Sequence, residues 1–169
     1  HLHSVDLKGN IITLDNTQGH HSADFSANFS YRIHNHSDAN TPPVYTLRDR
    51  KGNVVRTLKS NDDLKNTLSE YDYSEKEFFS FTNSSVTELN CWKILPHDFD
   101  AVKEYPVYVA IYGGPGVNTV TDSWGGANLM WYKYLAQEGY IVVSVDPRGT
   151  PLRGRKFEHS TYKELGKLE

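Results

Sequence analysis

A glycine-rich loop follows an apolar segment in the second half of the chain, and its composition could stabilise negative charge. The segment Tyr105–Tyr112 reads Tyr-Pro-Val-Tyr-Val-Ala-Ile-Tyr and runs directly into Gly113-Gly-Pro-Gly116. The apolar run 107–112 is typical of a short strand buried on both faces of a mainly parallel sheet. Loops at the carboxyl ends of such strands carry the chemistry of open α/β sheets. Glycines there let backbone N–H groups approach a developing oxyanion, although the loop also fits a tight strand-to-helix turn that binds nothing.

One set of residues follows the chain order of a serine hydrolase triad. Ser123, Asp146 and His159 occur in the order Ser, Asp, His, which α/β-hydrolases use. The nucleophile of those enzymes lies in a G-x-S-x-G elbow, a strained turn that needs small residues on both sides of the serine. No G-x-S-x-G occurs in the chain, and Asp122 and Trp124 flank Ser123. We therefore interpret Ser123 as a loop or helix-capping serine.

Paired histidines and two arginines are further candidates for binding sites. No cysteine partner or H-E-x-x-H motif accompanies the histidines, so we predict no metal site and interpret them as surface and blade-turn residues. Arg148 and Arg153 follow a predicted strand and could bind a carboxylate or phosphate, but structural ion pairs are the favoured interpretation. The histidine pairs are His1/His3, His20/His21 and His34/His36.

The composition is that of a folded chain with no nucleic-acid or membrane signature. Hydrophobic residues make up 37% of the 169 residues, and the formal net charge of −3 comes from intermixed acidic and basic side chains. No basic stripe indicates nucleic acid or an anionic membrane, and no apolar run approaches the length of a membrane span. Cys91 is the only cysteine, so neither an internal disulfide nor a thiolate zinc site is predicted. The chain opens in strand-like sequence without Met, and we expect it to be a piece of a longer protein.

The first 60 residues follow a β pattern that contains a near-repeat. Two predicted hairpins surround the turns Lys8-Gly-Asn10 and Lys51-Gly-Asn53, whose glycines are 43 residues apart, close to the period of one propeller blade. Between them Phe25–His34 alternates apolar and polar residues, as half-buried strands do. Two unrelated hairpins could share this turn sequence. The favoured interpretation is that residues 1–60 form the last part of a β-propeller, whose other blades would cover its faces.

A connector leads from this region into a strand–helix–strand pattern. Residues 61–76 are predicted to connect the two halves through a short helix that Asn61 or Asp62 would cap and that ends before Tyr71. Residues 77–169 are predicted to hold an antiparallel strand pair and then a β-α-β unit, which implies a parallel sheet. The predicted strands are 78–82, 88–95, 107–112 and 141–145, and the predicted helices are 129–138, ended by Gly139, and 157–165.

Several segments carry a resemblance that runs in register over most of the chain. They are Pro42–Leu47, Glu88–Lys93, Tyr105–Pro115, Asp146–Thr150 with Arg153-Gly154, and Leu165–Glu169. Together they resemble the prolyl oligopeptidase family of serine peptidases, in particular its dipeptidyl peptidase IV branch. The resemblance implies a mixed β and α/β chain: the C-terminal part of a β-propeller, residues 61–76 as connector, and the start of an α/β-hydrolase catalytic domain over 77–169.

The resemblance also assigns a role to the glycine loop. In the family the tyrosine immediately before the Gly-Gly-Pro-like loop donates its hydroxyl to the oxyanion hole. Tyr112 is the matching residue, and Gly113 and Gly114 would shape the pocket around it. The family's catalytic Ser, Asp and His would lie outside this chain, so the chain alone should be inactive. The segment Thr150–Arg153 departs from relatives that often have glycines there, so its loop is expected to differ in shape.

The function implied by the resemblance is a serine exopeptidase that releases N-terminal dipeptides, with a preference for Xaa-Pro, through an acyl-enzyme. No cofactor and no metal are expected. The expected partners are peptide substrates, the remainder of the same polypeptide and, following the family, a second copy in a homodimer. The expected location is secreted or periplasmic, with or without a membrane anchor in a missing N-terminal segment. A propeller–hydrolase relative that has lost its nucleophile and serves in binding is the alternative, as is a hydrolase for other esters or longer peptides.

Overall fold

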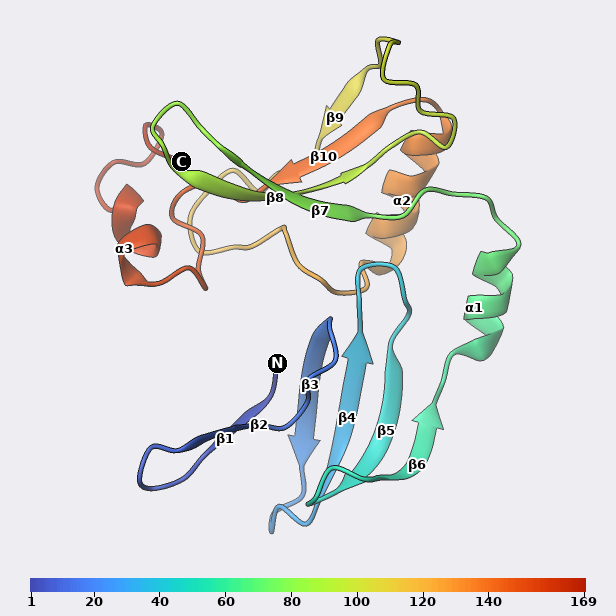
Figure 1. The fold of residues 1–169 in the computed structure, drawn as a ribbon, viewed down its shortest axis with the longest axis vertical. Helices are drawn as coiled ribbons and strands as arrows, with labels where there is room; N and C mark the ends of the chain where they lie inside the picture. The colour runs from blue at the N-terminus through green and yellow to red at the C-terminus, as the bar shows by residue number, and fades with distance from the viewer. The chain divides into compact units, whose positions relative to one another are not determined.

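The computed structural model describes residues 1–169, which form two compact units (Figure 1). The first unit comprises residues 1–71 and 122–126, and the second comprises residues 72–121 and 127–169. Each unit has its own four-stranded sheet, and each is described by itself. The chain is mixed, with mostly antiparallel strand pairs and few helices. None of the helices combines the length and the hydropathy that crossing a membrane requires.

A four-stranded antiparallel meander dominates the first unit. Its strands pair in chain order, β3-β4-β5-β6, and a separate hairpin, β1–β2, precedes them. Helix α1 follows the last strand, and none of its residues is buried. The bounds are β1 His3–Val5, β2 Ile11–Thr13, β3 His20–Phe25, β4 Tyr31–Ser37, β5 Val44–Asp49, β6 Val54–Lys59 and α1 Asp62–Ser69.

The two Lys-Gly-Asn turns share one structure. In each turn an aspartate that lies two residues before the lysine, Asp6 or Asp49, accepts the backbone amide of the turn asparagine at 2.9 Å. The side chain of the same asparagine also donates to that carboxylate, which is the main reason why the pKa of each aspartate is lowered. The turn glycine has a φ of +87° in the first case and +93° in the second, a conformation that glycine adopts without steric cost. The repeated sequence therefore encodes a repeated local structure.

The segment Phe25–His34, which alternates apolar and polar residues, holds the end of one strand and the start of the next. β3 ends at Phe25, the chain turns through residues 26–30, and β4 begins at Tyr31. The amide of Ser26 donates to the Tyr31 carbonyl at 3.0 Å, and Phe29 at the tip has a φ of +56°. The two strands therefore form a tight hairpin.

Helix α1 is confirmed, but Asn61 does not cap it. The backbone of Asn61 is left-handed, with a φ of 56°, and its side chain makes no hydrogen bond to the first turn of the helix. The side-chain amide instead donates to the carbonyl of Pro43 at 2.7 Å. Asn61 therefore ties the start of the helix to the segment that enters β5.

A mixed four-stranded sheet forms the second unit. The order is β7-β8-β10-β9, in which β10 pairs antiparallel with β8 and parallel with β9. Helix α2 connects the parallel pair, which confirms the predicted β-α-β unit. The bounds are β7 Glu77–Thr82, β8 Glu88–Ile94, β9 Val107–Val109, α2 Gly126–Gln137, β10 Ile141–Val145, α3 Arg155–Glu158 and the 3₁₀ turn η1 His159–Thr161.

Helix α2 has a buried stripe and a glycine stop, both predicted from sequence. Leu129 and Ala136 lie on the buried face with 1% and 2% of their surface exposed. The amide of Gly139 donates to the Ala136 carbonyl at 3.1 Å, and the following amide, of Tyr140, donates to the Leu135 carbonyl at 3.0 Å. This pair of bonds is a Schellman motif, which requires a left-handed residue. Gly139 supplies it with a φ of +86°.

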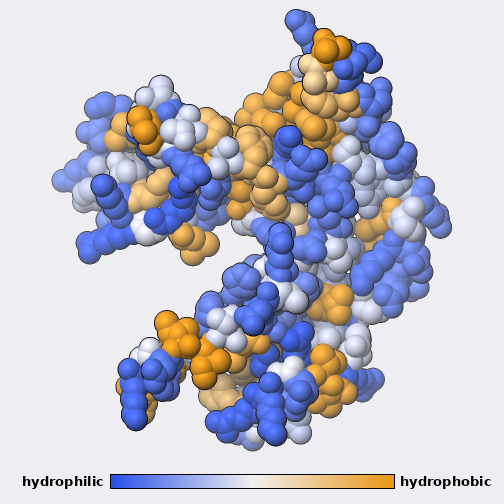
Figure 2. Space-filling view, viewed as in Figure 1, coloured by the Kyte–Doolittle hydropathy of each residue, from blue (hydrophilic) through white to orange (hydrophobic).

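Two predictions for the second unit are wrong. The strand predicted over 107–112 stops at Val109, and its three residues are 56%, 40% and 54% exposed rather than buried on both faces. β9 is an edge strand, and β10 is its one neighbour in the sheet. Figure 2 shows hydrophobic surface around the part of the second unit where Figure 1 places β9. The helix predicted over 157–165 is only the single turn of α3 followed by η1. An apolar run specifies a strand, but its burial depends on elements that pack against it.

Lys133 lies on the buried stripe of α2 and has an unusual environment. Its side chain is 3% exposed, and the ammonium nitrogen lies 3.5 Å from the centroid of the Tyr73 ring. Nζ makes no hydrogen bond. Burial lowers the pKa of Lys133 from 10.5 to about 8, while the nearby Glu75 carboxylate acts in the opposite direction.

The lowered pKa of Lys133 predicts how stability changes at alkaline pH. The unfolded chain holds the proton up to about pH 10.5 and the folded chain only up to about pH 8, so the folded state gains stability as the pH rises through this window. The gain should reach at most about 3 kcal/mol. We expect Lys133→Met to abolish this rise, whereas Lys103→Met, at an exposed lysine, should retain it. Urea unfolding of the complete protein at pH 7.5, 9 and 10.5 measures the difference, and parallel profiles for Lys133→Met and the unsubstituted protein would contradict the assignment.

Candidate functional site

The predicted glycine loop leaves the sheet just beyond the end of β9. Tyr112 opens it with 61% of its surface exposed. Gly113 and Gly116 have φ values of +77° and +82°, which residues with a Cβ rarely adopt. The amide of Gly116 donates to the Gly149 carbonyl at 3.0 Å, whereas the amides of Gly113 and Gly114 make no hydrogen bond within the chain. The loop thus presents a phenol and two backbone donors at the carboxyl end of a parallel strand, and donors of this kind stabilise an oxyanion.

Gly114 lies directly against the ring of Tyr112. A Cβ built on Gly114 would be 3.2 Å from Cε1 of Tyr112, closer than most real Cβ contacts. A side chain at this position would need the Tyr112 ring to shift by a few tenths of an ångström. Gly114 therefore allows the tyrosine ring to lie close to the backbone of the loop.

A buried carboxylate holds the far end of the same loop. Asp146, directly after β10, is 2% exposed. Its Oδ1 accepts the amides of Thr119 and Val120 at 2.7 and 3.2 Å and the Thr119 hydroxyl at 3.0 Å. Its Oδ2 accepts the side-chain amide of Asn118 at 2.9 Å. One carboxylate therefore fixes three consecutive residues of the loop that follows β9.

Gly149 provides a second attachment between the two loops. Besides accepting the Gly116 amide, it has a φ of +91°, and a Cβ at this position would lie 2.5 Å from Thr161 Oγ1 and 2.9 Å from Pro115 Cβ. Such distances leave no room for a side chain. The loop after β9, the loop after β10 and η1 therefore meet at one glycine.

Comparison with known proteins finds relatives of this chain. Residues 127–169 match the family model described as the prolyl oligopeptidase family. The chain is 34% identical to dipeptidyl peptidase 4 of Arthroderma otae, over 100% of this chain and 22% of that protein, and 35% identical to the Trichophyton equinum enzyme of the same name with the same coverage. The crystal structure of Porphyromonas gingivalis dipeptidyl peptidase 4 matches with a TM-score of 0.91 at 38% identity, over 98% of this chain and 23% of that one.

Over its last quarter the chain matches the prolyl oligopeptidase family, and over its whole length it is similar to proteins named dipeptidyl peptidase 4. It spans about a fifth of the length of the relatives that it matches. The loop after β9 begins at the exposed Tyr112, carries two backbone amides that bond no other group of the chain, and is held by Asp146 at its far end.

The triad order Ser123, Asp146, His159 does not correspond to a catalytic arrangement around the aspartate. The side-chain and backbone donors that reach the Asp146 carboxylate come from residues 118–120, and no histidine is among them. A triad aspartate must orient its histidine through a hydrogen bond. Asp146 orients a loop instead, which agrees with the sequence-based interpretation that Ser123 is not a catalytic nucleophile.

The two arginines after β10 serve as anchors in different ways. Arg153 donates from Nη1 to the backbone carbonyl of Glu88 and lies 3.9 Å from the carboxylate of the same residue, with its guanidinium over the Phe157 ring at 4.2 Å. This confirms the structural ion pair predicted for Arg153. Arg148 donates from Nε to the carbonyl of Leu168 rather than to an acid, so for Arg148 the ion-pair prediction is wrong.

Two of the paired histidines are buried, which corrects their interpretation as surface residues. His21 and His34 are 5% and 1% exposed, and His21 Nδ1 lies 3.1 Å from His34 Nε2. They reach each other because residues 21 and 34 stand near each other on the same side of the antiparallel pair β3–β4. The other nitrogen of His21 bonds the Thr17 carbonyl at 2.8 Å, and Nδ1 of His34 faces the Asp15 carboxylate at 3.3 Å.

The ligand atoms of Asp15, His21 and His34 lie within 4.8 Å of one another, yet this cluster does not suit a divalent cation. The Asp15 carboxylate already pairs with the guanidinium groups of Arg32 and Arg48, so a metal ion would add two positive charges beside two others in a buried place. Burial, followed by the charge of Arg48, lowers the pKa of His34 to about 4. The cluster therefore holds β3, β4, β5 and the segment before them together as a buried ionic network.

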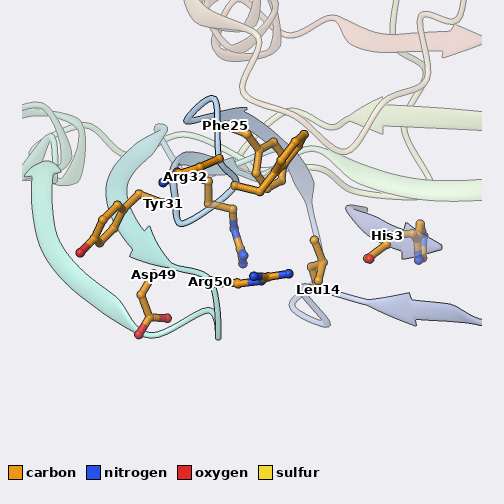
Figure 3. Close-up of a pocket in the computed structure, with 10 residues that line it drawn as sticks. His3, Leu14, Phe25, Tyr31, Arg32, Asp49 and Arg50 are labelled. Carbon is orange, nitrogen blue, oxygen red and sulfur yellow. The ribbon is translucent and has the colours of Figure 1, made fainter. Parts of the chain in front are cut away.

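A separate cavity of about 470 Å³ lies in the first unit, between the β1–β2 hairpin and the sheet (Figure 3). Phe25 and Tyr31 contribute aromatic surface, and the side chains of Arg32 and Arg50 also line the cavity. Arg32 has its counter-ion in Asp15 at 3.3 Å. The cavity lining contains no pair of side chains arranged as nucleophile and base.

Sequence reasoning found Tyr112 and its glycines but missed the residues that hold them. Asp146 and Gly149 belong to the Asp-Pro-Arg-Gly-Thr segment that carried part of the family resemblance. An aspartate directly after a buried strand, followed three residues later by glycine, was a usable signal for a loop attachment. Its partners, 26 to 28 residues earlier, could not be read from the sequence.

The contact at Gly149 predicts a position-specific loss of stability. Gly149→Ala combines a φ of +91° with a clash against Thr161 and Pro115. Gly154→Ala is the matched control, because Gly154 has a φ of +83° and a Cβ added there would meet no atom within 4 Å. We expect the control to cost about 1 kcal/mol of unfolding free energy and Gly149→Ala to cost at least about 2 kcal/mol more. Equal losses in denaturant titrations of the two variants would show that the loops are not in close contact.

The lowered pKa of His34 predicts sensitivity to acid. Between about pH 6.5 and pH 4 the unfolded chain binds a proton at this residue and the folded chain does not, so stability falls as the pH falls through this window. His34→Gln removes the titrating ring and should flatten the fall in Tm, while His20→Gln, at an exposed position of β3, should leave it unchanged. If His34→Gln and the unsubstituted protein lost the same number of degrees from pH 7 to pH 4.5, the burial of a neutral His34 would be refuted.

Proposed function

We propose that these residues are part of a serine exopeptidase that releases dipeptides from the N-terminus of peptide substrates, with proline preferred at the second position. The relatives named dipeptidyl peptidase 4 cover the whole chain at 34% and 35% identity, which supports the substrate class. The observation that carries the proposal is the exposed phenol of Tyr112 next to the unbonded amides of Gly113 and Gly114.

The division into a propeller end and a hydrolase start belongs to the same proposal. A four-stranded antiparallel meander with exposed apolar residues on its outer strand, such as Val54 and Val55, is what one blade of a propeller would look like without its neighbours. The sheet of the second unit has a parallel β-α-β unit with a free edge at β9, as expected if more parallel strands follow it.

The proposed reaction proceeds through an acyl-enzyme on a serine that lies outside these residues. A histidine base takes the proton of the serine hydroxyl, and the oxygen forms a bond to the scissile carbonyl carbon, whose oxygen becomes negatively charged. The Tyr112 hydroxyl donates a hydrogen bond to that oxygen, and this bond strengthens as charge develops. The C–N bond then breaks and the amine leaves with the proton; water releases the dipeptide from the serine in a second, equivalent step.

The proposal predicts the kinetic effect of Tyr112→Phe, which removes the hydroxyl and keeps the ring. Loss of one oxyanion donor costs about 2.7–4 kcal/mol in the barrier, so kcat for a Gly-Pro-anilide should fall roughly 100- to 1,000-fold with KM changed less than about threefold. Tyr134→Phe is the control, since Tyr134 is a similarly exposed tyrosine, 49% against 61%, on α2.

Two outcomes would count against this account. A rise in KM with unchanged kcat would show that Tyr112 binds the substrate rather than its transition state. A folded complete protein that binds proline peptides but does not turn them over would identify a binding relative that lacks the nucleophile. Steady-state kinetics on the purified complete protein, with peptide binding measured by calorimetry, separates the two results.

A further inference from the structure

We propose that Asp146 is a positioning residue for Tyr112: its buried carboxylate fixes the loop that carries the tyrosine and so determines where the phenol points. This inference rests on the function proposed above. Asp146 contacts neither the Tyr112 ring nor the amides of Gly113 and Gly114. Its proposed role is to hold the loop in place, and it does not touch the substrate.

The hydrogen bonds of Asp146 show that the carboxylate and the loop depend on each other. Both oxygens accept, and all the donors that reach them from Asn118, Thr119 and Val120 are neutral. No lysine or arginine pairs with Asp146, in contrast to Asp15 of the first unit. A carboxylate that is 2% exposed is costly to bury unless donors replace the water around it. The loop supplies those donors only in the conformation that it has here.

The loop is tied on both sides of Tyr112, and the downstream ties lead to one segment. Upstream, the amide of Ala110 donates to the Val143 carbonyl at 2.8 Å. Downstream, the Gly116 amide bonds Gly149, three residues after Asp146, and Asp146 itself holds 118–120. Tyr112 thus lies in a stretch of five residues, 111–115, between two fixed points. The spacing of those points limits the conformations open to Tyr112.

Neighbouring side chains reinforce the downstream tie at Thr119. Its carbonyl accepts the indole N–H of Trp92 at 3.0 Å, and its hydroxyl lies 2.9 Å from the Ser144 hydroxyl. Trp92 and Ser144 are 3% and 0% exposed and belong to the paired strands β8 and β10. Thr119 therefore attaches the loop to two buried residues of the sheet as well as to the Asp146 carboxylate.

Asp146→Asn tests the inference because it conserves shape and replaces one acceptor oxygen by a donor. The new amide would face the donating side chain of Asn118, so the loop should lose its attachment at that point. A displacement of the phenol by a fraction of an ångström to 1 Å should lower kcat roughly 10- to 100-fold, with little change in KM. If Asp146 only stabilised the fold, its substitution would lower Tm without a selective fall in kcat.

A double-mutant cycle with Tyr112→Phe, in the complete protein, separates positioning from general destabilisation. If Asp146 acts through the phenol, Asp146→Asn should lower kcat by less than about threefold once the hydroxyl is absent. Thr150→Val is the matched control: Thr150 is fully buried in the same segment but bonds only Pro147, at 3.1 Å. It should lower Tm and leave kcat unchanged.

Hydrogen exchange of the peptide that spans residues 111–121 provides a readout that does not need activity. Asp146→Asn should speed exchange at the Gly116 amide, which Asp146 does not touch, and Thr150→Val should not. If Asp146→Asn does not fold, Thr119→Val, which removes the hydroxyl bond to Asp146 at 3.0 Å together with the 2.9 Å contact with the Ser144 hydroxyl but keeps the backbone bonds to Asp146, should give the same pattern with a smaller amplitude.

The outcomes assign failure to one claim or the other. If Tyr112→Phe leaves kcat unchanged, the proposed function fails, whatever Asp146→Asn does. If Tyr112→Phe lowers kcat but the effects of the two substitutions multiply in full, or exchange at Gly116 stays the same, the positioning role of Asp146 is overturned and the proposed function stands.

Discussion

A buried carboxylate that has no cationic partner organises the second unit. Asp146 lies at the end of β10, where the sheet stops and the loops begin, and neutral donors of one neighbouring loop satisfy its oxygens. Removing water from such a group is unfavourable unless every acceptor position finds a donor. The loop after β9 must therefore adopt one conformation for the sheet to form with Asp146 inside it. Tyr112 and its two glycines are part of that loop, so the same requirement also orders the candidate site.

The first unit satisfies a buried aspartate in a different way, and the contrast is informative. Asp15 pairs with Arg32 and Arg48 and faces His34, so the charge is compensated by charge, and the network links strands rather than shaping a loop. Asp146, in contrast, accepts hydrogen bonds from neutral donors only, and its bonds shape a loop.

The sequence was informative where local rules decide the structure. The stop of α2 at Gly139, the paired Lys-Gly-Asn turns and the tyrosine at the start of the glycine loop each follow from residues that are adjacent in the chain. It was misleading at β9, where an apolar run was read as a buried strand, because burial is a property of the neighbours and β10 is the one neighbour present. It gave no sign that His21 would meet His34 or that Asp146 would bind residues 118–120. Such contacts depend on strand register and loop path, which single residue types do not encode.

The central claim is that the hydroxyl of Tyr112 lies where negative charge develops during catalysis. The most direct measurement is a crystal structure of the complete protein with a dipeptide boronic acid that ends in boroproline, which forms a tetrahedral adduct with a catalytic serine. We predict that one boronate oxygen lies about 2.7–3.1 Å from the Tyr112 hydroxyl and within hydrogen-bonding distance of a backbone amide. A tetrahedral adduct whose oxygens all lie more than about 4 Å from that hydroxyl, beyond hydrogen-bond reach, would contradict it.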